Sequence, residues 1–451
     1  MLANDTPEMD REFVEAYPLA WRPLTPADVT AIHGQRSFHA IEAITLYLHI
    51  PFCPELCGFC GFNKTSFRQE TYERYVDMLV REIAHYVDHP DLEDRSVTAI
   101  YIGGGTGSTL TPPDLDRVIS AVAETFPLVS GCELTVESHP ATLSADKLRA
   151  YAASGVNRLS IGTQSFSDRK LGALGRHHTA GDNRRVLAEA RHAGLENVSI
   201  DLLYRVPEET LAELESDLST ILEEQPTNVA CYSLIVEGTS FARTLSSLPA
   251  RELEDEMRAT VASMLMGAGY QRWSLNDFCH PGGMTIYNVN YWVAPQTLLL
   301  GLGAGSHTHY FGGHIWTNAY SVNDYIDAIE QDRFPGVAGQ PVTVEELMHR
   351  FMVMGLHCLA VDMGRFEQTF GESGWVRFDH QIRELSAHGW VERVGDELRV
   401  LPAGHPYIFN ISKAFFSAAN IGRGQPWSMG LRAVKAEHPV VLRNRPLIQP
   451  S

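Results

Sequence analysis

Residues 49–63 read HIPFCPELCGFCGFN, in which Cys53, Cys57 and Cys60 stand at C-x3-C-x2-C spacing. The apolar run at residues 44–50 precedes this stretch and is typical of a buried strand. Three thiols so close together indicate a shared metal or cluster. A structural zinc site needs four closed ligands, and no fourth cysteine or suitably spaced histidine follows. The spacing therefore favours a [4Fe–4S] cluster with one open iron over a zinc site or unligated thiols.

The cysteine spacing also resembles the signature of radical S-adenosylmethionine (SAM) enzymes. Its flanks, YLHIPFC at 47–53 and CGFNK at 60–64, are similar to those of the oxygen-independent coproporphyrinogen III oxidase family, which includes haem chaperones and class C radical SAM methylases. The resemblance implies that Cys53, Cys57 and Cys60 ligate the cluster and that SAM chelates its open iron. It also implies that the cluster reduces SAM to a 5′-deoxyadenosyl radical, while the protein supplies binding and orientation.

The composition is ordinary for a globular chain. Its 451 residues are enough for one large domain and a smaller one. The net charge of −19 disfavours binding to nucleic acids or anionic membranes, which needs basic patches. We expect no membrane span, because no apolar run approaches roughly 20 residues, and no secretory signal in the acidic residues 1–15.

The remaining cysteines are scattered, mostly in apolar runs, and are expected to be buried free thiols. They are Cys132, Cys231, Cys279 and Cys358. A disulfide framework is not expected in a long chain without a signal. We therefore expect the protein in the reducing cytoplasm.

Strand and helix patterns alternate from about residue 41 to 240, which predicts βαβ units and a parallel sheet. The predicted strands are continuous apolar runs at residues 44–50, 97–102, 133–136, 158–161, 198–203 and 229–234. The six units resemble the partial (β/α)6 TIM-like radical SAM barrel, an α/β fold. We expect an N-terminal extension at 1–40, the barrel and its extension at 41–310, a C-terminal domain at 341–417 and an irregular tail at 418–451.

Polar or glycine-rich segments follow the predicted strands at their C-terminal ends, where βα-barrels carry their working residues. The second strand ends in Gly103-Gly104-Gly105-Thr106, a run that lets backbone N–H groups approach a ligand. Glu137 ends the third strand and Asp201 lies in the fifth. A buried carboxylate of this kind needs a partner.

The resemblance assigns roles to these residues and to several others. It implies catalytic roles for Tyr47 and Glu137. The residues implied to bind the cofactor are Gly104, Gly105, Thr106, Glu137, Gln164, Arg176, Asp201, Phe278 and His307. Phe278 and the GLGAG run at 301–305 align with places that surround a second SAM in the oxidase, although a tight strand turn also explains GLGAG.

Two departures from the family pattern stand near these residues. Gly107-Ser108 replaces the usual Pro-Thr, which predicts a looser loop. Arg205 replaces a usual glycine, which predicts a bulky cation at the barrel mouth. With Tyr204 and His139, Arg205 hints at a polar or anionic group on the substrate.

Residues 341–415 predict a small helical domain with a short hairpin, similar to a winged helix. A last helix is expected from Tyr407 to Phe416. Winged helices often bind DNA, but the acidic balance argues against that function here. We expect this domain to close over the barrel instead.

Two positions bear on which member of the family this chain resembles. Phe62 stands where coproporphyrinogen oxidase has a fourth cysteine, and haem chaperones have phenylalanine there. Tyr287 stands where haem chaperones have a histidine proposed to bind haem, and a phenol is a rarer haem ligand than imidazole.

These departures favour a class C-type methylase, which uses two SAM molecules to add a one-carbon unit to an sp2 carbon of a small-molecule substrate. Porphyrinogen oxidation and haem delivery stay open as alternatives. Each of these activities would draw electrons from a reductase such as flavodoxin or ferredoxin. No nucleic-acid or membrane partner is expected.

Overall fold

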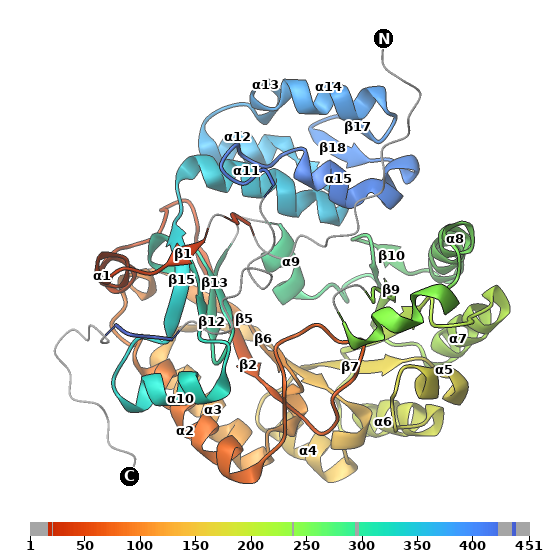
Figure 1. Ribbon diagram of the computed structural model, residues 1–451, viewed down its shortest axis with the longest axis horizontal. Helices are drawn as coiled ribbons and strands as arrows, with labels where there is room; N and C mark the ends of the chain where they lie inside the picture. Colours follow the sequence, from red (N-terminus) through yellow and green to blue (C-terminus); the bar gives the residue numbers. More distant parts are fainter. Residues whose placement is uncertain (1–16, 20, 237–238, 294–296, 423–434, 439–451) are drawn as a thin grey trace.

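The computed structural model describes residues 17–19, 21–236, 239–293, 297–422 and 435–438. A curved sheet with helices along its outer side forms the larger part of the molecule, and a smaller domain lies across its open side (Figure 1). Within these ranges, none of the helices is long and apolar enough to cross a membrane.

The core of the main sheet is six parallel strands that lie in sequence order, so each predicted strand is present. They are β2 (Ala43–Ile50), β5 (Ser96–Gly104), β6 (Leu128–Ser138), β7 (Arg158–Gln164), β8 (Val198–Tyr204) and β9 (Asn228–Ser233). Both faces of these strands are covered, which explains their nearly continuous apolar sequences. The arrangement is the predicted TIM-barrel-like α/β fold.

Three further strands complete the main sheet, and the sequence did not predict them. β12 (Thr297–Leu302) pairs in parallel with β2. On the other edge, β11 (Asp277–Cys279) pairs antiparallel with β9, and β10 (Gln271–Arg272) pairs antiparallel with β11. The edge strands β12 and β10 do not pair with each other, so the barrel stays partial.

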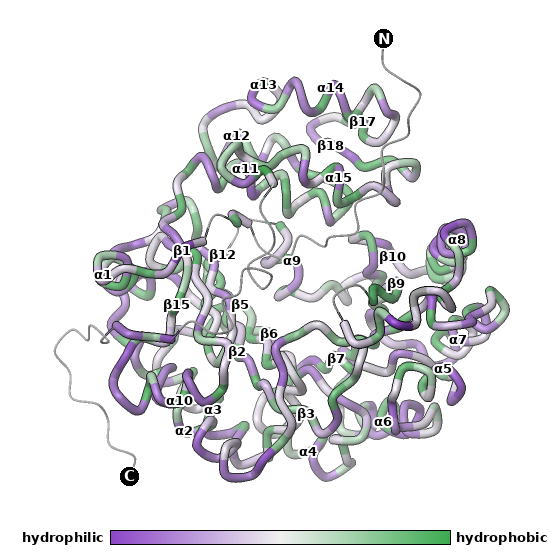
Figure 2. The backbone as a smooth tube through the Cα atoms, in the orientation of Figure 1, coloured by the Kyte–Doolittle hydropathy of each residue, from purple (hydrophilic) through white to green (hydrophobic). Residues whose placement is uncertain are grey.

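Amphipathic helices cover the outer side of the sheet (Figure 2). They are α2 (Gln69–Ala84), α3 (Pro112–Thr125), α4 (Ala145–Ala153), α5 (Asp168–Ala173), α6 (Ala180–His192), α7 (Leu211–Glu224) and α8 (Arg251–Gly267). α3 begins as its sequence predicts, because the Thr111 hydroxyl accepts a hydrogen bond from the backbone N–H of Asp114 and proline occupies the first turn.

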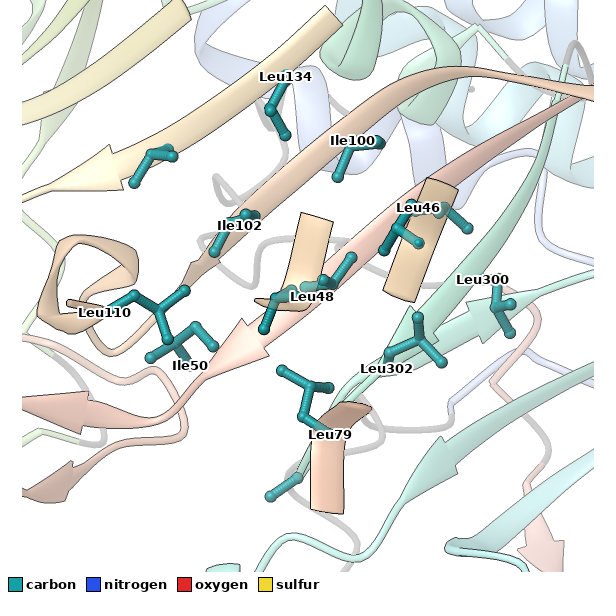
Figure 3. Packing of buried hydrophobic residues seen from close by; sticks show 14 of the residues in the cluster. Leu46, Leu48, Ile50, Leu79, Ile100, Ile102, Leu110, Leu134, Leu300 and Leu302 are labelled. Carbon is teal, nitrogen blue, oxygen red and sulfur yellow. The ribbon is translucent and has the colours of Figure 1, made fainter. Parts of the chain in front are cut away.

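Alternate residues of each strand face opposite sides of the sheet. On the helix side they form one hydrophobic core with residues of α2 and α3 (Figure 3). Members of this core include Leu46, Leu48, Ile100, Ile102 and Leu300, all essentially inaccessible to solvent. The residues between them point into the barrel and are mostly polar or aromatic.

A second sheet follows the barrel and includes part of the N-terminal segment. Its order is β1 (Arg22–Pro23), β15 (Gly336–Pro341), β14 (His314–Asn318) and β13 (His307–His309). α1 (Pro26–Gly34) and α10 (Val322–Glu330) lie beside it. The expected domain boundary at residue 310 falls between β13 and β14, which pair, so this sheet extends the barrel region to Pro341.

The C-terminal domain has its own hydrophobic core. Its helices are α11 (Val344–Gly355), α12 (Met363–Phe370), α13 (Gly374–Arg377), α14 (Asp379–Ala387) and α15 (Ile408–Lys413). Its sheet has three strands, β16 (Ala360–Asp362), β18 (Glu397–Val400) and β17 (Val391–Val394), rather than the predicted hairpin alone. α15 is shorter than the helix predicted from Tyr407 to Phe416.

The N-terminal segment contacts both parts of the molecule: Trp21, Leu24, Val29 and Ile32 belong to the core of the barrel region. Tyr17 and Leu19 belong to the core of the C-terminal domain. Arg350 of α11 donates hydrogen bonds to the backbone oxygens of Tyr17 and Tyr291. Tyr291 lies in α9 (Ile286–Trp292), a helix between the two edges of the barrel. The N-terminal segment, α9 and the C-terminal domain are therefore tied together across the open side of the barrel.

Candidate functional site

The cysteine loop leaves the C-terminal end of β2 and is held at both ends. β3 (Phe52–Cys53) pairs with β4 (Thr65–Ser66), which brings the two ends of the loop side by side. The backbone N–H of Cys60 donates to the Cys57 carbonyl, which closes a turn at 3.3 Å. The loop is thus anchored at both ends and places its thiols at the C-terminal ends of the strands, where βα-barrels carry their sites.

The surroundings of the three thiols suit thiolate ligands. Arg176 Nη1 lies 3.3 Å from Cys57 Sγ, and the Thr106 hydroxyl lies 3.7 Å from Cys53 Sγ. Burial raises the pKa of the Cys53 thiol to about 11, and the charges of Cys60 and Cys57 act in the same direction. A bound cation would therefore be needed to hold Cys53 as a thiolate.

The distances between the three thiols indicate whether they can hold one metal ion or a cluster. In the described part of the chain, no three His, Cys, Asp or Glu side chains come close enough to hold one metal ion. The ligands of a [4Fe–4S] cluster each bind a different iron atom, so its thiolates need not meet at one point. Three free cysteines on one anchored loop, with Arg176 beside them, fit such a cluster.

The glycine run at the end of β5 packs directly against the cysteine loop. A Cβ on Gly105 would lie 2.5 Å from the Pro51 carbonyl oxygen and 3.0 Å from Cys53 Sγ. Gly104 has a φ of +114°, and its backbone N–H donates to the Glu137 carboxylate at 2.9 Å. Only glycine permits this approach, which brings backbone donors beside the thiols.

The loop after the glycine run is not looser, contrary to the expectation from Gly107-Ser108. These residues open a short 3-10 turn and are buried. The backbone N–H of His139 donates to the Ser108 hydroxyl at 3.2 Å. The serine therefore ties this loop to the end of β6.

Three carboxylates face the inside of the barrel. Burial raises the pKa of Glu137 and of Asp201 to about 7, and the neighbouring carboxylates add to the rise. Burial likewise raises the pKa of Asp277, on β11, to about 6. Carboxylates with raised pKa values are suited to meet a cationic ligand, which would favour their ionised forms.

Asp277 is a site residue that the sequence reasoning missed. Its charge contributes to the raised pKa of Asp201, and the Ser274 hydroxyl donates to it at 2.6 Å. The resemblance assigns cofactor contact to the next residue, Phe278, instead. The signal was present, because an acid within an otherwise apolar strand needs a reason.

Phe278 does not lie at the site. It pairs with Val229 of β9, belongs to the hydrophobic core on the helix side, and lies under the Arg272 guanidinium. Successive strand residues point to opposite faces, so the residue beside Asp277 faces away from the barrel interior. The implied contact of Phe278 with a second SAM therefore does not fit its position.

Arg205 does not stand free at the barrel mouth. It has a φ of +63°, is buried, and its Nε lies 3.2 Å from a Glu254 carboxylate oxygen. Its Nη1 donates to the Leu234 carbonyl at 3.1 Å. The turn directs this cation into the wall between β8 and α8, where its charge is neutralised, so it gives no support to an anionic substrate group.

Gln164 and Arg176 come together over Gly162. The Arg176 Nη2 donates to the Gly162 carbonyl at 2.7 Å, and a Cβ on Gly162 would lie 2.8 Å from Gln164 Nε2. Gln164 has a φ of +64°, a conformation that is strained outside glycine. Such strain persists only where the surroundings hold it in place.

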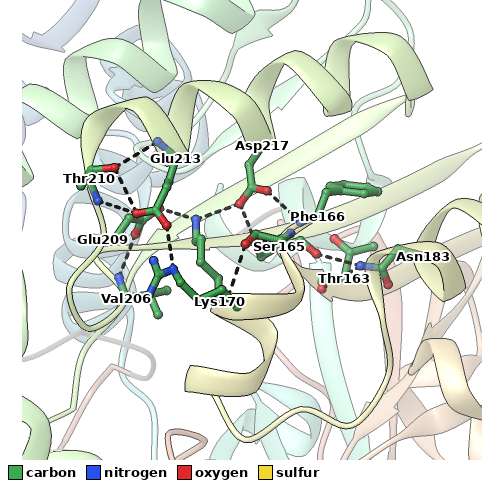
Figure 4. A network of polar contacts seen from close by, with 12 residues as sticks. Thr163, Ser165, Phe166, Lys170, Asn183, Val206, Glu209, Thr210, Glu213 and Asp217 are labelled. Carbon is green, nitrogen blue, oxygen red and sulfur yellow. Dashed lines mark hydrogen bonds and ion pairs between the residues drawn. The ribbon is translucent and has the colours of Figure 1, made fainter.

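A buried polar network supports this strained strand end (Figure 4). Lys170 of α5 is completely buried and forms ion pairs with Glu209 and Asp217. Asp217 also accepts hydrogen bonds from the Ser165 hydroxyl at 2.7 Å and the Phe166 backbone N–H at 2.8 Å. The network therefore joins the ends of β7 and β8 to α7.

Tyr47 and His307 lie on the same side of the barrel. The Tyr47 hydroxyl lies 3.0 Å from His49 Nδ1, and His49 Nε2 lies 2.9 Å from the Asn63 carbonyl oxygen in the cysteine loop. His307 lies 3.1 Å from the Tyr320 hydroxyl, and burial lowers its pKa to about 4, with His49 as a further cause. Tyr47 thus reaches the cysteine loop through His49, whereas His307 lies within electrostatic reach of His49.

The GLGAG run supports the cysteine loop. Gly303 has a φ of +95°, and a Cβ there would lie 2.4 Å from the Tyr75 hydroxyl. Asn63, at the end of the cysteine loop, donates to the Ala304 carbonyl at 3.1 Å. The run is a tight turn, and this arrangement explains why it needs glycine.

α9 closes the N-terminal end of the barrel and places Tyr287 inside it. Glu133, at the start of the paired part of β6, accepts hydrogen bonds from the backbone N–H groups of Ile286 and Tyr287. The Tyr287 ring lies 4.5 Å from the Tyr101 ring and is 9% exposed. The position where haem chaperones have histidine is therefore enclosed by aromatic side chains of the barrel.

The chain was compared with known proteins. Residues 47–221 match the radical SAM superfamily, and residues 342–407 match the HemN C-terminal domain. The heme chaperone HemW of Bacillus subtilis is 34% identical over 355 residues, which cover 76% of this chain and 92% of the relative. The mitochondrial radical S-adenosyl methionine domain-containing protein 1 of Bos taurus is 33% identical over 82% of this chain and 84% of that protein.

A solved structure agrees with the fold. The coproporphyrinogen III oxidase HemN of Escherichia coli superposes with a TM-score of 0.75 and 24% sequence identity. The match covers 87% of this chain and 94% of the oxidase. It extends over the barrel and the C-terminal domain.

Proposed function

We propose that this chain, which belongs to the oxygen-independent coproporphyrinogen III oxidase-like family of radical SAM proteins, handles haem in the manner of a haem chaperone. The observation that carries the proposal is the 34% identity to a heme chaperone along 92% of its length. Phe62 supports it, because the coproporphyrinogen oxidases have a fourth cysteine at that position and the haem chaperones have phenylalanine. Phe62 is 61% exposed, so no packing requirement explains an aromatic side chain there.

The proposed cofactors are one [4Fe–4S] cluster and SAM, as membership of the radical SAM superfamily implies. Cys53, Cys57 and Cys60 would hold the cluster. When bound, the cluster and SAM supply one-electron chemistry that amino-acid side chains do not provide. An electron donor such as flavodoxin or ferredoxin belongs to the same proposal.

The side chains around the cysteine loop have separate proposed roles toward SAM. Glu137 and Asp201 would meet its ammonium, sulfonium or ribose groups, since a nearby cation stabilises an ionised carboxylate. The backbone N–H groups of Gly104 and Gly105 and the Arg176 guanidinium would contact its carboxylate. We infer one SAM site, because the position of Phe278 does not support a second.

Tyr287 is not proposed as a haem ligand. Its ring is packed against Tyr101 inside the barrel, and the residue is 9% exposed. Haem binding by this chain would then depend on contacts other than this tyrosine.

Class C-type methyl transfer is the second candidate, and Tyr287 is the observation that favours it. It lacks support from the names of the curated relatives described above. It also requires a second SAM, for which the described residues offer no contact at Phe278.

An anaerobic experiment separates these functions. The protein is reconstituted with iron and sulfide and titrated with haem, and SAM is then added with dithionite. A chaperone predicts a stable haem complex and little 5′-deoxyadenosine. S-adenosylhomocysteine together with 5′-deoxyadenosine would indicate methyl transfer instead, and carbon dioxide released from coproporphyrinogen would indicate oxidation.

The experiment has a matched control in the Cys57→Ala variant. This variant should lose the cluster and any SAM cleavage but keep haem binding if haem is held apart from the cluster. The proposal fails if the wild-type protein shows no saturable haem binding.

A further inference from the structure

Arg158 is a buried cation that faces the inside of the barrel. It begins β7 and is 2% exposed. In register, it lies beside Thr135 of β6, which in turn lies beside Tyr101 of β5. The next residue, Leu159, belongs to the hydrophobic core on the helix side. Alternation along the strand therefore directs Arg158 to the opposite side, into the barrel.

The guanidinium of Arg158 has few partners in the described part of the chain. Its Nη1 lies 3.5 Å from the Thr135 hydroxyl, which is the outer limit of a hydrogen bond. Its Nε is buried and has no hydrogen-bond partner. No carboxylate forms an ion pair with it among these residues. An arginine has five N–H donors, so most of its capacity is unused.

Two other buried cations of the molecule form ion pairs with buried carboxylates. Lys170 is paired with Glu209 and Asp217. Arg95 is paired with Asp91 at 2.6 Å. A buried charge without a partner is strongly unfavourable. Among the described residues, Arg350 is also buried without an ion pair, but it donates to two backbone oxygens. Within the same ranges Arg158 has only the Thr135 hydroxyl, so its guanidinium calls for a ligand.

Two carboxylates lie within electrostatic reach of Arg158 without pairing with it. The charge of Arg158 opposes the rise in the pKa values of Asp201 and Asp277, which shows that both are within electrostatic reach. Neither is close enough for an ion pair. The fork of N–H donors is thus left for a planar anion, which arginine binds with two parallel hydrogen bonds.

We propose that Arg158 binds a carboxylate group of the substrate inside the barrel. The identity of this group rests on the proposed function, under which it would be a propionate of haem. The carboxylate of SAM has the same chemistry, but the donors proposed for it lie at the C-terminal strand ends, whereas Arg158 lies at the N-terminal end of β7. The site would therefore orient a tetrapyrrole by one of its acidic arms.

The test compares haem with its dimethyl ester, which lacks both propionate charges, on the cluster-loaded full chain. Arg158→Met should weaken haem binding roughly ten- to a hundredfold, the effect of losing a charge-assisted hydrogen-bonded pair. It should leave ester binding unchanged and should change SAM affinity less than haem affinity, because the Arg158 charge reaches Asp201 only electrostatically. Arg158→Lys keeps the charge without the fork and should show a smaller loss for haem alone.

Thr135→Val is the matched control. It removes the one hydrogen bond that the Arg158 side chain makes among the described residues but keeps the guanidinium, so haem affinity should stay within about twofold of wild type. Equal losses for haem and ester in the Arg158 variants, together with a lower melting temperature, would overturn the proposal in favour of a structural role. A loss confined to SAM would overturn the assignment to substrate.

A second measurement does not depend on haem. Sodium propionate, compared with sodium chloride at equal ionic strength, should raise the melting temperature of wild type but not of Arg158→Met. That result with no haem binding by wild type would refute the proposed function and keep the carboxylate site. Haem binding that is unaffected by Arg158→Met would refute the carboxylate site and keep the function.

Discussion

The two faces of the main sheet come from alternate residues of the same strands, yet they differ in composition and in electrostatics. Leu46 and Leu48 pack into a core that needs only apolar volume. Tyr47, Glu137 and Arg158 lie on the other face, where a buried polar group needs a specific partner.

This comparison separates the sources of stability and of function. The helix side stabilises the fold through buried apolar area, whereas the inner side contains carboxylates with raised pKa values and a cation with little compensation. The inner face is therefore expected to become more stable when its ligands bind, since a ligand that binds only the folded state stabilises it.

The largest effect is expected at the cysteine loop. Cys57→Ala should abolish the cluster and all SAM cleavage, because two thiolates remain where three are needed. The measurements are iron content, visible absorption and 5′-deoxyadenosine. Retained cleavage in this variant would refute the cluster assignment.

The Lys170 network tests whether a polar group outside the barrel interior can matter for folding. Lys170→Met leaves Glu209 and Asp217 buried without their cation and should lower the free energy of unfolding by about 3–5 kcal/mol. The neighbouring Arg169→Met breaks an exposed ion pair with Glu213 and should cost about 0–1 kcal/mol. Urea unfolding of both variants checks the difference, and similar values would mean that the network is dispensable.

On the helix side of the sheet, the loss of apolar side-chain volume should lower stability without affecting ligand binding. Leu48→Ala should lower the free energy of unfolding by about 2–5 kcal/mol through a cavity, with unchanged SAM affinity per folded molecule. Tyr47→Phe, on the other face of the same strand, removes one hydroxyl and should cost about 0.5–1.5 kcal/mol. Chemical denaturation together with equilibrium dialysis of SAM distinguishes the faces, and the comparison breaks down if Leu48→Ala alters SAM affinity.

A substitution at Asp201 should weaken SAM binding but stabilise the fold. Asp201→Asn should weaken SAM binding about tenfold or more, the loss of a hydrogen bond to a charged group. It should also raise the free energy of unfolding at pH 7.5, because the wild-type carboxylate is disfavoured by burial. Calorimetry of SAM binding and thermal melting check the two halves, and a destabilised variant with normal SAM affinity would contradict both.

The carboxylates of the inner face should also make stability depend on pH. The pKa values of Glu137 and Asp201 are raised to about 7 in the folded state, so the unfolded chain releases these protons first. Stability of the ligand-free protein should therefore fall as pH rises from about 4 to 7 and level off above that. SAM affinity should rise over pH 6–8, because a cation binds the ionised forms. Melting temperatures and dialysis at pH 6 and 8 in wild type and Asp201→Asn test the signs.

Much of the fold was readable because it depends on local patterns. The continuous apolar run at 198–203 predicted β8, and the run at 229–234 predicted β9. β11 was missed because three residues carry no periodic signal. β12 was missed although it is a continuous apolar run of the kind that predicted β8.

The site was predictable where a polar residue ended an apolar run, as at Glu137 and Asp201, which the structure places inside the barrel. Their proposed roles toward SAM stay predictions. Prediction failed where the backbone conformation sets the direction in which a side chain points. The positive φ at Arg205 turns its side chain to Glu254, and one step of strand register separates Asp277 from Phe278. Arg158 was overlooked because a charged first strand residue normally lies at a surface.

The pairing of β2 with β12 affects how the polypeptide folds during its synthesis. The hydroxyls of Thr45 and Thr297 lie 3.2 Å apart although 252 positions separate them in sequence. During synthesis, one edge of β2 stays uncovered until residues 297–302 leave the ribosome, and an uncovered strand edge favours aggregation. Such distant pairing also slows folding. The nascent chain is therefore expected to depend on folding chaperones until about two thirds of it, through residue 302, has emerged.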